Sequence, residues 1–307
     1  MRLRWPAPGA AVDGPLLTVA EVTALVRAAP PAGAAPAGRG PRRGRPGEYS
    51  AATGGAGLDF ADLRPYAPGD DPRHIDWRAS ARAGETRVRG YHADVNRPLC
   101  LLMDRRPAMA FGTRRRLKVT QAARAVLWLA GRAMRGGREL AGVIIDEPCR
   151  WLPAATGAAA LERLAGLATA PRPPAVADAP GPPWERILAG LRGRLPAGAG
   201  LVMLSDFHGL DASHRAILGA VARHCDTTAI QVVDRAERAL PAAGMLELSW
   251  GGSRLTVDSD AAAGRLDPAF EARSAALAHL FARAGIDHRL LDGDAEELAP
   301  VLGTVAP

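Results

Sequence analysis

The sequence predicts an α/β fold with a mostly parallel β-sheet covered by helices on both faces. Three observations support this prediction. Short apolar runs alternate with amphipathic segments from residue 97 onward, two of these runs end in an aspartate, and glycine or proline separates many neighbouring segments. Repeated strand, helix, strand crossovers join parallel strands and leave helices on both sides of the sheet. We therefore expect a sheet domain over residues 97–307.

Two segments precede this domain. Residues 17–29 predict a short helix with Thr18 as its cap and Val22, Leu25 and Val26 on one face. A loop rich in Arg, Pro and Gly follows, which completes an N-terminal region of residues 1–48. Residues 49–96 form a second segment, which we expect to pack on the sheet domain.

The elements of the sheet domain follow from their apolar periodicity. In the strands 98–104, 140–146, 200–206 and 227–234 the apolar residues are nearly continuous, which is typical of strands buried on both faces. We expect strands also at 149–155 and 287–293, a hairpin at 246–258, and helices at 115–134, 157–168, 184–195, 212–224 and around Leu277 to Phe281. The proline-rich stretch between 170 and 183 cannot be helical.

Composition indicates little about partners. The 307 residues include 39 Lys and Arg against 32 Asp and Glu, a net charge of +7. Lys118 is the only lysine, and this near-exclusive use of arginine resembles the coding bias of a GC-rich genome. The charge is therefore a weak indication of nucleic-acid binding.

The cysteines and the apolar pattern lead us to expect a cytoplasmic protein. Cys100, Cys149 and Cys225 form no C-x-x-C pair and lie in or beside apolar runs, as buried reduced thiols do. The first residues lack the continuous apolar stretch of a signal peptide, and no run has the roughly 18 apolar residues of a membrane span. We expect no direct membrane insertion.

Residues 57–82, GLDFADLRPYAPGDDPRHIDWRASAR, combine many charges with few apolar side chains. The segment resembles the bacterial family called domain of unknown function 58, whose pattern is G-x-[ED]-F, R-x-Y-x-x-G-D-D-x-R-x-I-D-W and S-A-R. The pattern falls on Gly57, Asp59, Phe60, Arg64, Tyr66, Gly69, Asp70, Asp71, Arg73, Ile75, Asp76, Trp77, Ser80, Ala81 and Arg82. The resemblance implies a von Willebrand factor A-like domain after the motif.

Asp104 and Asp206 end two predicted strands and should meet at the carboxyl edge of the sheet. In von Willebrand factor A-like domains the first strand ends in D-x-S-x-S, which holds Mg²⁺. Here Arg106 and Ala108 stand where the two hydroxyls are expected, and Mg²⁺ needs about six oxygen ligands. We therefore expect a degenerate metal site and no cofactor. Arg106 either bridges Asp104 and Asp206 or is a solvated loop charge.

The motif segment allows two interpretations. Its acids and His74 can be metal ligands for hydrolysis, or the turn at Gly69 can be capped by carboxylates while Tyr66 and Trp77 anchor the segment on the sheet domain. We favour the second interpretation, which leaves a partner-binding surface. Its candidate residues are Arg64, Tyr66, Asp70, Asp71, Arg73, Asp76, Trp77 and Arg82.

No nucleophile or metal-ligand spacing predicts catalysis, and Ser205 has only His208 and His214 near it in sequence. Relatives in the resembled family are associated with MoxR-type AAA+ ATPases. We therefore expect a chaperone-like protein-binding module rather than an enzyme: an adaptor between such an ATPase and a client protein, with membrane-bound partners also open. The alternative is nucleic-acid binding through the arginines of 39–45 and 114–116.

Overall fold

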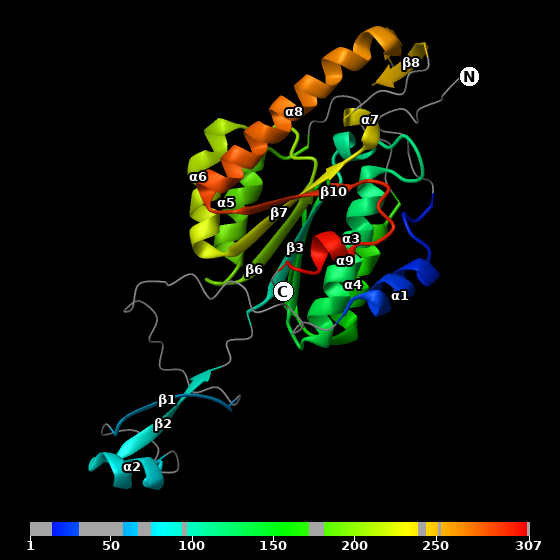
Figure 1. Cartoon of the computed structure of the whole chain (residues 1–307). Helices are drawn as coiled ribbons and strands as arrows, with labels where there is room; N and C mark the ends of the chain where they lie inside the picture. Colours follow the sequence, from blue (N-terminus) through cyan, green and yellow to red (C-terminus); the bar gives the residue numbers. More distant parts are fainter. Residues whose placement is uncertain are drawn as a thin grey trace. The chain divides into compact units, whose positions relative to one another are not determined.

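The computed structural model describes residues 14–30, 58–66, 75–93, 97–171, 181–238, 244–250 and 253–305. The chain divides into two compact units, shown in Figure 1. The sheet unit comprises residues up to Pro36 and from Arg97 onward, and the motif unit comprises Ala37–Asn96. The helix predicted near the N-terminus therefore belongs to the sheet unit.

The sheet unit contains a six-stranded sheet of order β10-β7-β6-β3-β4-β5. All neighbours are parallel except β5, which runs antiparallel to β4 at one edge. The strands are β3 (Leu99–Asp104), β4 (Leu140–Ile145), β5 (Arg150–Ala155), β6 (Gly200–Ser205), β7 (Asp226–Val233) and β10 (Asp287–Asp292), and a separate hairpin is formed by β8 (Met245–Trp250) and β9 (Ser253–Asp258). The prediction of a mostly parallel α/β sheet is confirmed.

Helices cover both faces of this sheet, as Figure 1 shows. They are α1 (Val19–Ala28), α3 (Lys118–Arg135), α4 (Gly157–Thr169), α5 (Trp184–Arg194), α6 (Arg215–His224), α7 (Arg235–Arg238), α8 (Ser259–Ala284) and α9 (Ala299–Leu302), with short 3-10 turns at Pro107–Met109 and Ala212–His214. Each long helix lies where its apolar periodicity predicts one.

The central strand β3 illustrates why both faces must be covered. Its residues are buried throughout, and successive side chains point to opposite faces. Leu101 and Met103 join the core that α1, α3 and α4 cover, whereas Cys100 and Leu102 join the core that α5, α6 and α8 cover. A strand between two apolar cores cannot alternate apolar with polar residues, which explains its continuous apolar sequence.

Helix α1 is fixed to α3 by specific contacts. Its N-terminus is closed by a capping box between Thr18 and Glu21, which confirms Thr18 as the predicted cap. A side chain at Gly131 of α3 would bring its Cβ within 2.5 Å of the Val26 carbonyl oxygen, so only glycine allows this approach. Arg135 then donates hydrogen bonds to the carbonyls of Val26 and Ala29 and caps the end of α1.

The motif unit is built on an antiparallel pair, β1 (Leu58–Pro65) and β2 (Arg87–Ala93), with a bulge between Phe60 and Asp62. In the sequence, the short helix α2 (Trp77–Ala83) lies between these two paired strands. Ser80 joins this helix to β2, because its Oγ accepts a 2.8 Å hydrogen bond from the backbone N–H of Arg87. The charged motif therefore contains regular secondary structure that its composition did not predict.

Two further findings concern the cysteines and the helices. All three cysteines are free, and Cys100 and Cys225 are buried. Burial, and then the neighbouring Asp226, raise the pKa of Cys225 to about 11, so this thiol stays protonated at neutral pH. None of the described helices combines the length and the apolar character needed to cross a membrane.

Candidate functional site at the carboxyl edge of the sheet

Strands β3 and β6 deliver two carboxylates to one edge of the sheet. The strands are parallel and in register from Leu99 opposite Gly200 to Met103 opposite Leu204, so both end at the same level. Asp104 is the last residue of β3, and Asp206 directly follows β6. They are 1% and 6% exposed, so each negative charge needs a partner inside the protein.

The partner of Asp104 is Arg106, two residues further along the chain. The Arg106 Nε lies 3.1 and 3.2 Å from the two carboxylate oxygens of Asp104, and its Nη2 donates to Oδ2 at 2.8 Å. The guanidinium also lies 4.4 Å from the centre of the Trp184 ring, and the Ser205 hydroxyl donates to Asp104 Oδ2 at 2.6 Å. These contacts occupy both oxygens of the carboxylate.

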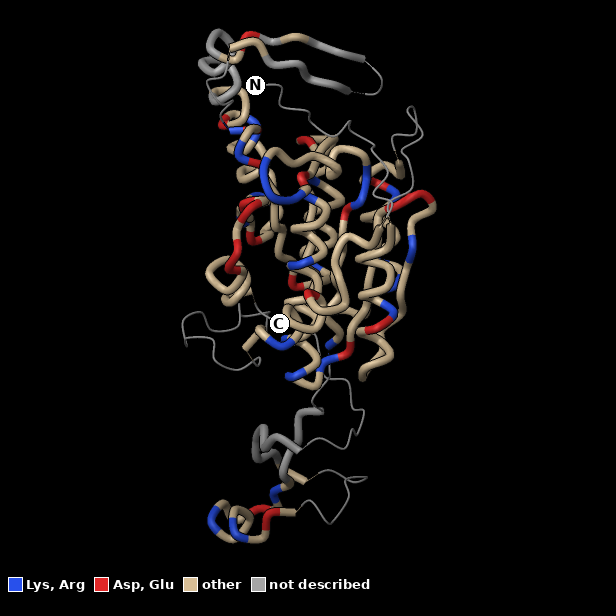
Figure 2. The backbone as a smooth tube through the Cα atoms, turned by 90° about the vertical axis from the view of Figure 1, so that its right-hand side faces the viewer, with Lys and Arg blue, Asp and Glu red and all other residues tan. Residues whose placement is uncertain are grey.

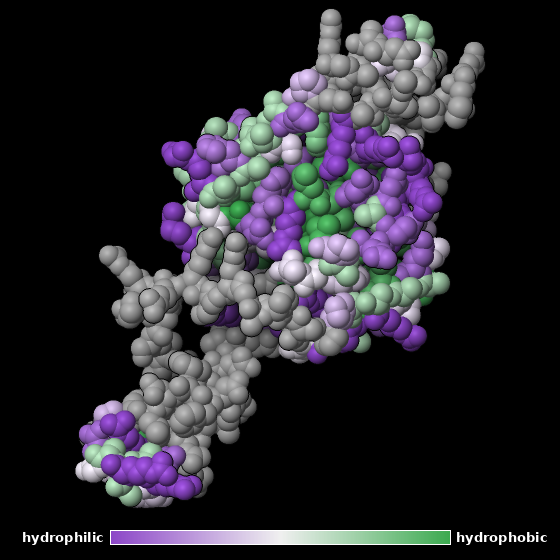
Figure 3. Space-filling model, viewed as in Figure 1, coloured by the Kyte–Doolittle hydropathy of each residue, from purple (hydrophilic) through white to green (hydrophobic). Residues whose placement is uncertain are grey.

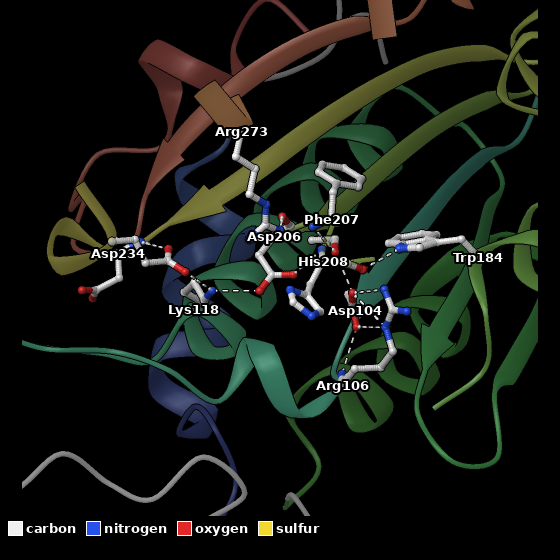
Figure 4. Close-up of polar contacts among 11 residues, drawn as sticks. Asp104, Arg106, Lys118, Trp184, Asp206, Phe207, His208, Asp234 and Arg273 are labelled. Atoms are coloured by element: carbon white, nitrogen blue, oxygen red, sulfur yellow. Dashed lines mark hydrogen bonds and ion pairs between the residues drawn. The ribbon is translucent and has the colours of Figure 1, made fainter. Parts of the chain in front are cut away.

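The partner of Asp206 is Lys118, the first residue of α3. The Lys118 ammonium lies 2.9 Å from Asp206 Oδ2, a contact drawn in Figure 4, and 2.7 Å from Glu237 Oε1. The Lys118 side chain is only 2% exposed. The expected bridge from Arg106 to both aspartates is therefore wrong in its second half. Arg106 holds Asp104, and the only lysine of the chain holds Asp206.

The charges of this pair reinforce each other. Burial on its own raises the pKa of Asp206, but the charge of the Lys118 ammonium and its hydrogen bond lower it by more. The pKa of Asp206 therefore lies below its usual value. Burial lowers the pKa of Lys118, whereas Asp206 and Glu237 raise it, and the net pKa lies above its usual value. Both groups are therefore ionised at neutral pH.

Glu237 extends this cluster to the end of β7. Its second oxygen accepts a 2.9 Å hydrogen bond from the Asp234 backbone N–H. The Asp234 carboxylate accepts from the Thr113 hydroxyl at 2.6 Å and from the Thr113 backbone N–H at 2.9 Å. The loops that follow β3, β6 and β7 are thus connected through Thr113, Asp234, Glu237, Lys118 and Asp206.

The turn after β6 has an unusual backbone. Phe207 has φ of 54°, and it is the only described non-glycine residue with positive φ. Its ring packs against Trp184 and Phe281, with ring centres 5.7 and 4.9 Å apart, and these contacts hold the strained conformation. The next residue, His208, is exposed and lies between the two aspartates in Figure 4.

The residues at this edge do not fit the magnesium site that the resemblance implies. The Ala108 side chain supplies no oxygen, Ser205 donates its hydroxyl to Asp104, and Oδ2 of each aspartate already accepts a hydrogen bond from a basic side chain. Within the described residues no three His, Cys, Asp or Glu side chains are grouped so that they can share a metal ion.

The motif residues are placed less completely. Asp70, Asp71 and Arg73 lie outside the described residues. Arg64 is in β1, and Arg82 is in the last turn of α2. Tyr66 follows the last residue of β1 and is 39% exposed.

Two neighbouring motif residues have different roles. Asp76 caps α2, with its Oδ1 accepting from the backbone N–H groups of Arg78 and Ala79 at 3.1 and 3.0 Å. Trp77 is 70% exposed. Anchoring of Trp77 and Tyr66 on the sheet domain stays a prediction.

Sequence reasoning missed Lys118 and Glu237 as site residues. Lys118 carried a signal, since it is the only lysine among 39 basic residues, but coding bias explained the arginines without explaining the exception. Glu237 carried none, because it lies 119 positions from the lysine that it binds.

Comparison with known proteins places the chain among related sequences. The family model described as "Protein of unknown function DUF58" matches residues 62–279. Uncharacterized proteins of Mycobacterium bovis and Mycobacterium tuberculosis are each 31% identical over 260 residues, which cover 79% of this chain and 72% of theirs.

A solved structure, an aerotolerance-related membrane protein from Bacteroides fragilis, aligns with 8% identity and a TM-score of 0.40 over 64% of this chain and 91% of that one. The family match includes most of the motif and both edge aspartates. The chain belongs to the DUF58 family.

Proposed function

We propose that this chain is a non-enzymatic protein-interaction module with a von Willebrand factor A-like sheet domain. In this proposal it acts in the cytoplasm as an adaptor that presents client proteins to a MoxR-type AAA+ ATPase for assembly or maturation. The observation that carries the proposal is Trp77, which is 70% exposed at the start of α2. An exposed tryptophan is a large apolar surface of the kind that dominates binding energy at protein interfaces.

The surroundings of Trp77 favour a partner with an acidic surface. Arg78 and Arg82 are exposed on the same short helix, one turn apart. Arginine and tryptophan are the residue types most enriched among interface hot spots. Figure 3 shows that the visible surface of the described part of α2 is mostly hydrophilic, as is the polar rim of a protein interface.

Helix α2 holds this surface in a fixed geometry. Asp76 caps its first turn, and Gly84 ends the helix in the left-handed conformation with φ of 72°. Ser80 Oγ donates to the Asp76 carbonyl at 2.7 Å and ties the helix to β2. A contact residue on a rigid element loses little conformational entropy on binding, which favours affinity.

The carboxyl edge favours a binding role over hydrolysis. Ser205 is fully buried, donates to Asp104 and accepts from the Phe207 backbone N–H at 2.8 Å, so its hydroxyl serves the structure of the turn. His214 pairs with Glu185 at 2.9 Å and with Asp211 at 3.0 Å. Neither arrangement resembles a nucleophile with its general base.

A pull-down from the native cytoplasm tests the proposal, with wild type, Trp77→Ala and the matched control Met245→Ala. Met245 is also an exposed apolar residue, at 66%, but lies in β8 of the sheet unit. We expect wild type and Met245→Ala to recover an AAA+ ATPase, identified by mass spectrometry, and Trp77→Ala to recover about 30-fold less, the effect of losing one strong hot spot.

Salt and folding controls complete this test. Circular dichroism confirms that each variant is folded, and moderate salt should weaken recovery because arginines flank the tryptophan. Equal recovery with Trp77→Ala would contradict the assigned surface. Recovery of nucleic acid in place of the ATPase would favour the alternative function, although Figure 2 shows acidic residues interspersed with the basic ones along the sheet unit.

A further inference from the structure

Lys118 is the exception in a chain that otherwise uses arginine for every fixed positive charge. It is also almost completely buried, with its ammonium 2.9 Å from Asp206 Oδ2 and 2.7 Å from Glu237 Oε1. An ammonium is a compact charge with three donors, whereas a guanidinium is a wide planar fork. The space between these two carboxylates therefore suits a compact ammonium better than the planar guanidinium of arginine.

The surroundings complete the coordination of that ammonium. The centre of the Phe111 ring lies 5.5 Å from Lys118 Nζ, which adds an attraction between cation and aromatic face. Asp206 Oδ1 is held separately by the His208 backbone N–H at 2.9 Å, and Glu237 Oε2 by the Asp234 N–H at 2.9 Å. Both carboxylates are thus oriented by the backbone so that one oxygen of each faces the ammonium.

Arg106 does the same for the neighbouring carboxylate. Its guanidinium contacts both oxygens of Asp104 and is held in place by stacking at 4.4 Å from Trp184. A side chain larger than hydrogen at Gly181 would approach the Arg106 stem to 3.0 Å, so the arginine is also enclosed from the side. Asp104 and Asp206 are therefore each paired with a cationic side chain of the same chain.

We propose that Lys118 is the resident cation of the carboxyl edge, where its ammonium takes the position between Asp206 and Glu237 that a metal ion would take, while Arg106 neutralises Asp104. Because these cations belong to the chain, they cannot dissociate. The loops after β3, β6 and β7 are therefore held in one arrangement that neither divalent cations nor chelators change. This inference concerns the sheet unit and does not depend on the adaptor function or on the Trp77 surface.

Thermal unfolding of the full chain with Mg²⁺, with Ca²⁺ or with EDTA tests this assignment. We expect the wild-type Tm to be the same in all three conditions. Lys118→Met removes the ammonium but keeps an unbranched apolar stem, and it leaves the buried Asp206 carboxylate facing the partly exposed carboxylate of Glu237. We expect its Tm to fall by roughly 6–20 °C in EDTA, because the loss of one partner of a buried ion pair leaves the other charge uncompensated.

Divalent cations then distinguish a cation site from an ordinary ion pair. In Lys118→Met, Ca²⁺ should recover part of the lost Tm, because the two carboxylate oxygens still face the vacated position and Ca²⁺ accepts irregular oxygen geometry. The matched control is Arg115→Met, which removes the same charge from a side chain that is 69% exposed and should leave Tm nearly unchanged.

A second variant keeps the test decisive if Lys118→Met does not fold. The triple change Lys118→Met, Asp206→Asn, Glu237→Gln removes the carboxylates together with the cation, so it should fold and show no response to Ca²⁺. Three results would overturn the proposal: a wild-type Tm that rises with Mg²⁺ or Ca²⁺, a Lys118→Met Tm equal to wild type, or a folded Lys118→Met protein whose Tm does not respond to Ca²⁺. If Lys118→Met fails to fold, a triple variant that also fails to fold overturns it.

Discussion

The carboxyl edge of the sheet and the helix of the motif unit both concentrate polar residues, but they treat them in opposite ways. At the edge, Asp104 and Asp206 are buried and each is neutralised by a basic side chain. In the motif unit, Trp77 and the arginines of α2 remain exposed. The difference separates charge that maintains a structure from surface that is available to a partner. Mutations should therefore change stability at the edge and binding at α2.

The largest effect is expected at Asp206. Asp206→Ala leaves the Lys118 ammonium buried with only Glu237 as its partner, and loss of one member of a buried ion pair typically costs about 3–5 kcal/mol. Urea unfolding measures the free energy of unfolding. A loss below about 1 kcal/mol would show that the edge tolerates unpaired charge and would remove the contrast with α2.

The pH dependence of stability should carry the same signature. The pKa of Asp206 lies below its ordinary value of 3.8, so its stabilising contribution is complete above that pH and is lost as pH falls through the lower, folded-state pKa. The pKa of Lys118 lies above 10.5, so its contribution is complete below pH 10.5 and is lost as pH rises through the higher, folded-state pKa.

Unfolding of wild type and Asp206→Asn at a series of pH values measures this contribution. The stability difference between the two proteins should be constant between about pH 5 and 9 and should decrease below pH 3.8. A difference that grows on acidification would mean that Lys118 does not control the ionisation of Asp206.

A smaller effect is expected at the cap of α2. Asp76→Ala removes the acceptor for the N–H groups of Arg78 and Ala79 and should cost about 1 kcal/mol, confined to the motif unit. Hydrogen exchange should show faster exchange at these two amides and unchanged exchange in α3. Equal acceleration in both helices would contradict the independence of the two regions.

The smallest effect on stability is expected for Trp77→Ala. Because the side chain is 70% exposed, its removal should change the free energy of unfolding by less than about 0.5 kcal/mol, although it should reduce partner recovery about 30-fold. A loss above about 1.5 kcal/mol in urea unfolding would instead identify Trp77 as a packing residue. That result would agree with the expectation that Trp77 anchors the motif segment on the sheet domain.

The sequence predicted the sheet unit well because its signals are local. The buried side chains of strand β3 and helix α3 follow apolar patterns that can be recognised within one short segment of sequence. The motif unit was less predictable, since the pairing of Arg64 with Val88 joins positions that no local apolar pattern connects. The antiparallel pair β1 and β2 and the helix between them were therefore missed.

At the candidate site the same distinction holds for single contacts. Arg106 and Asp104 are two residues apart, so the geometry of the turn after β3 brings them together and their pairing could be predicted. Lys118 lies 88 positions before Asp206 and 119 before Glu237. Their contact exists only after α3, β6 and β7 have packed on one sheet.

The sequence by itself thus determined the α/β architecture, the family motif and the arrival of two aspartates at one edge, because these depend on periodicity and on the parallel direction of strands. The tertiary structure alone decided which cation neutralises Asp206. A buried carboxylate takes whichever donor packing brings within hydrogen-bond distance, and no local pattern encodes a contact between residues 88 positions apart.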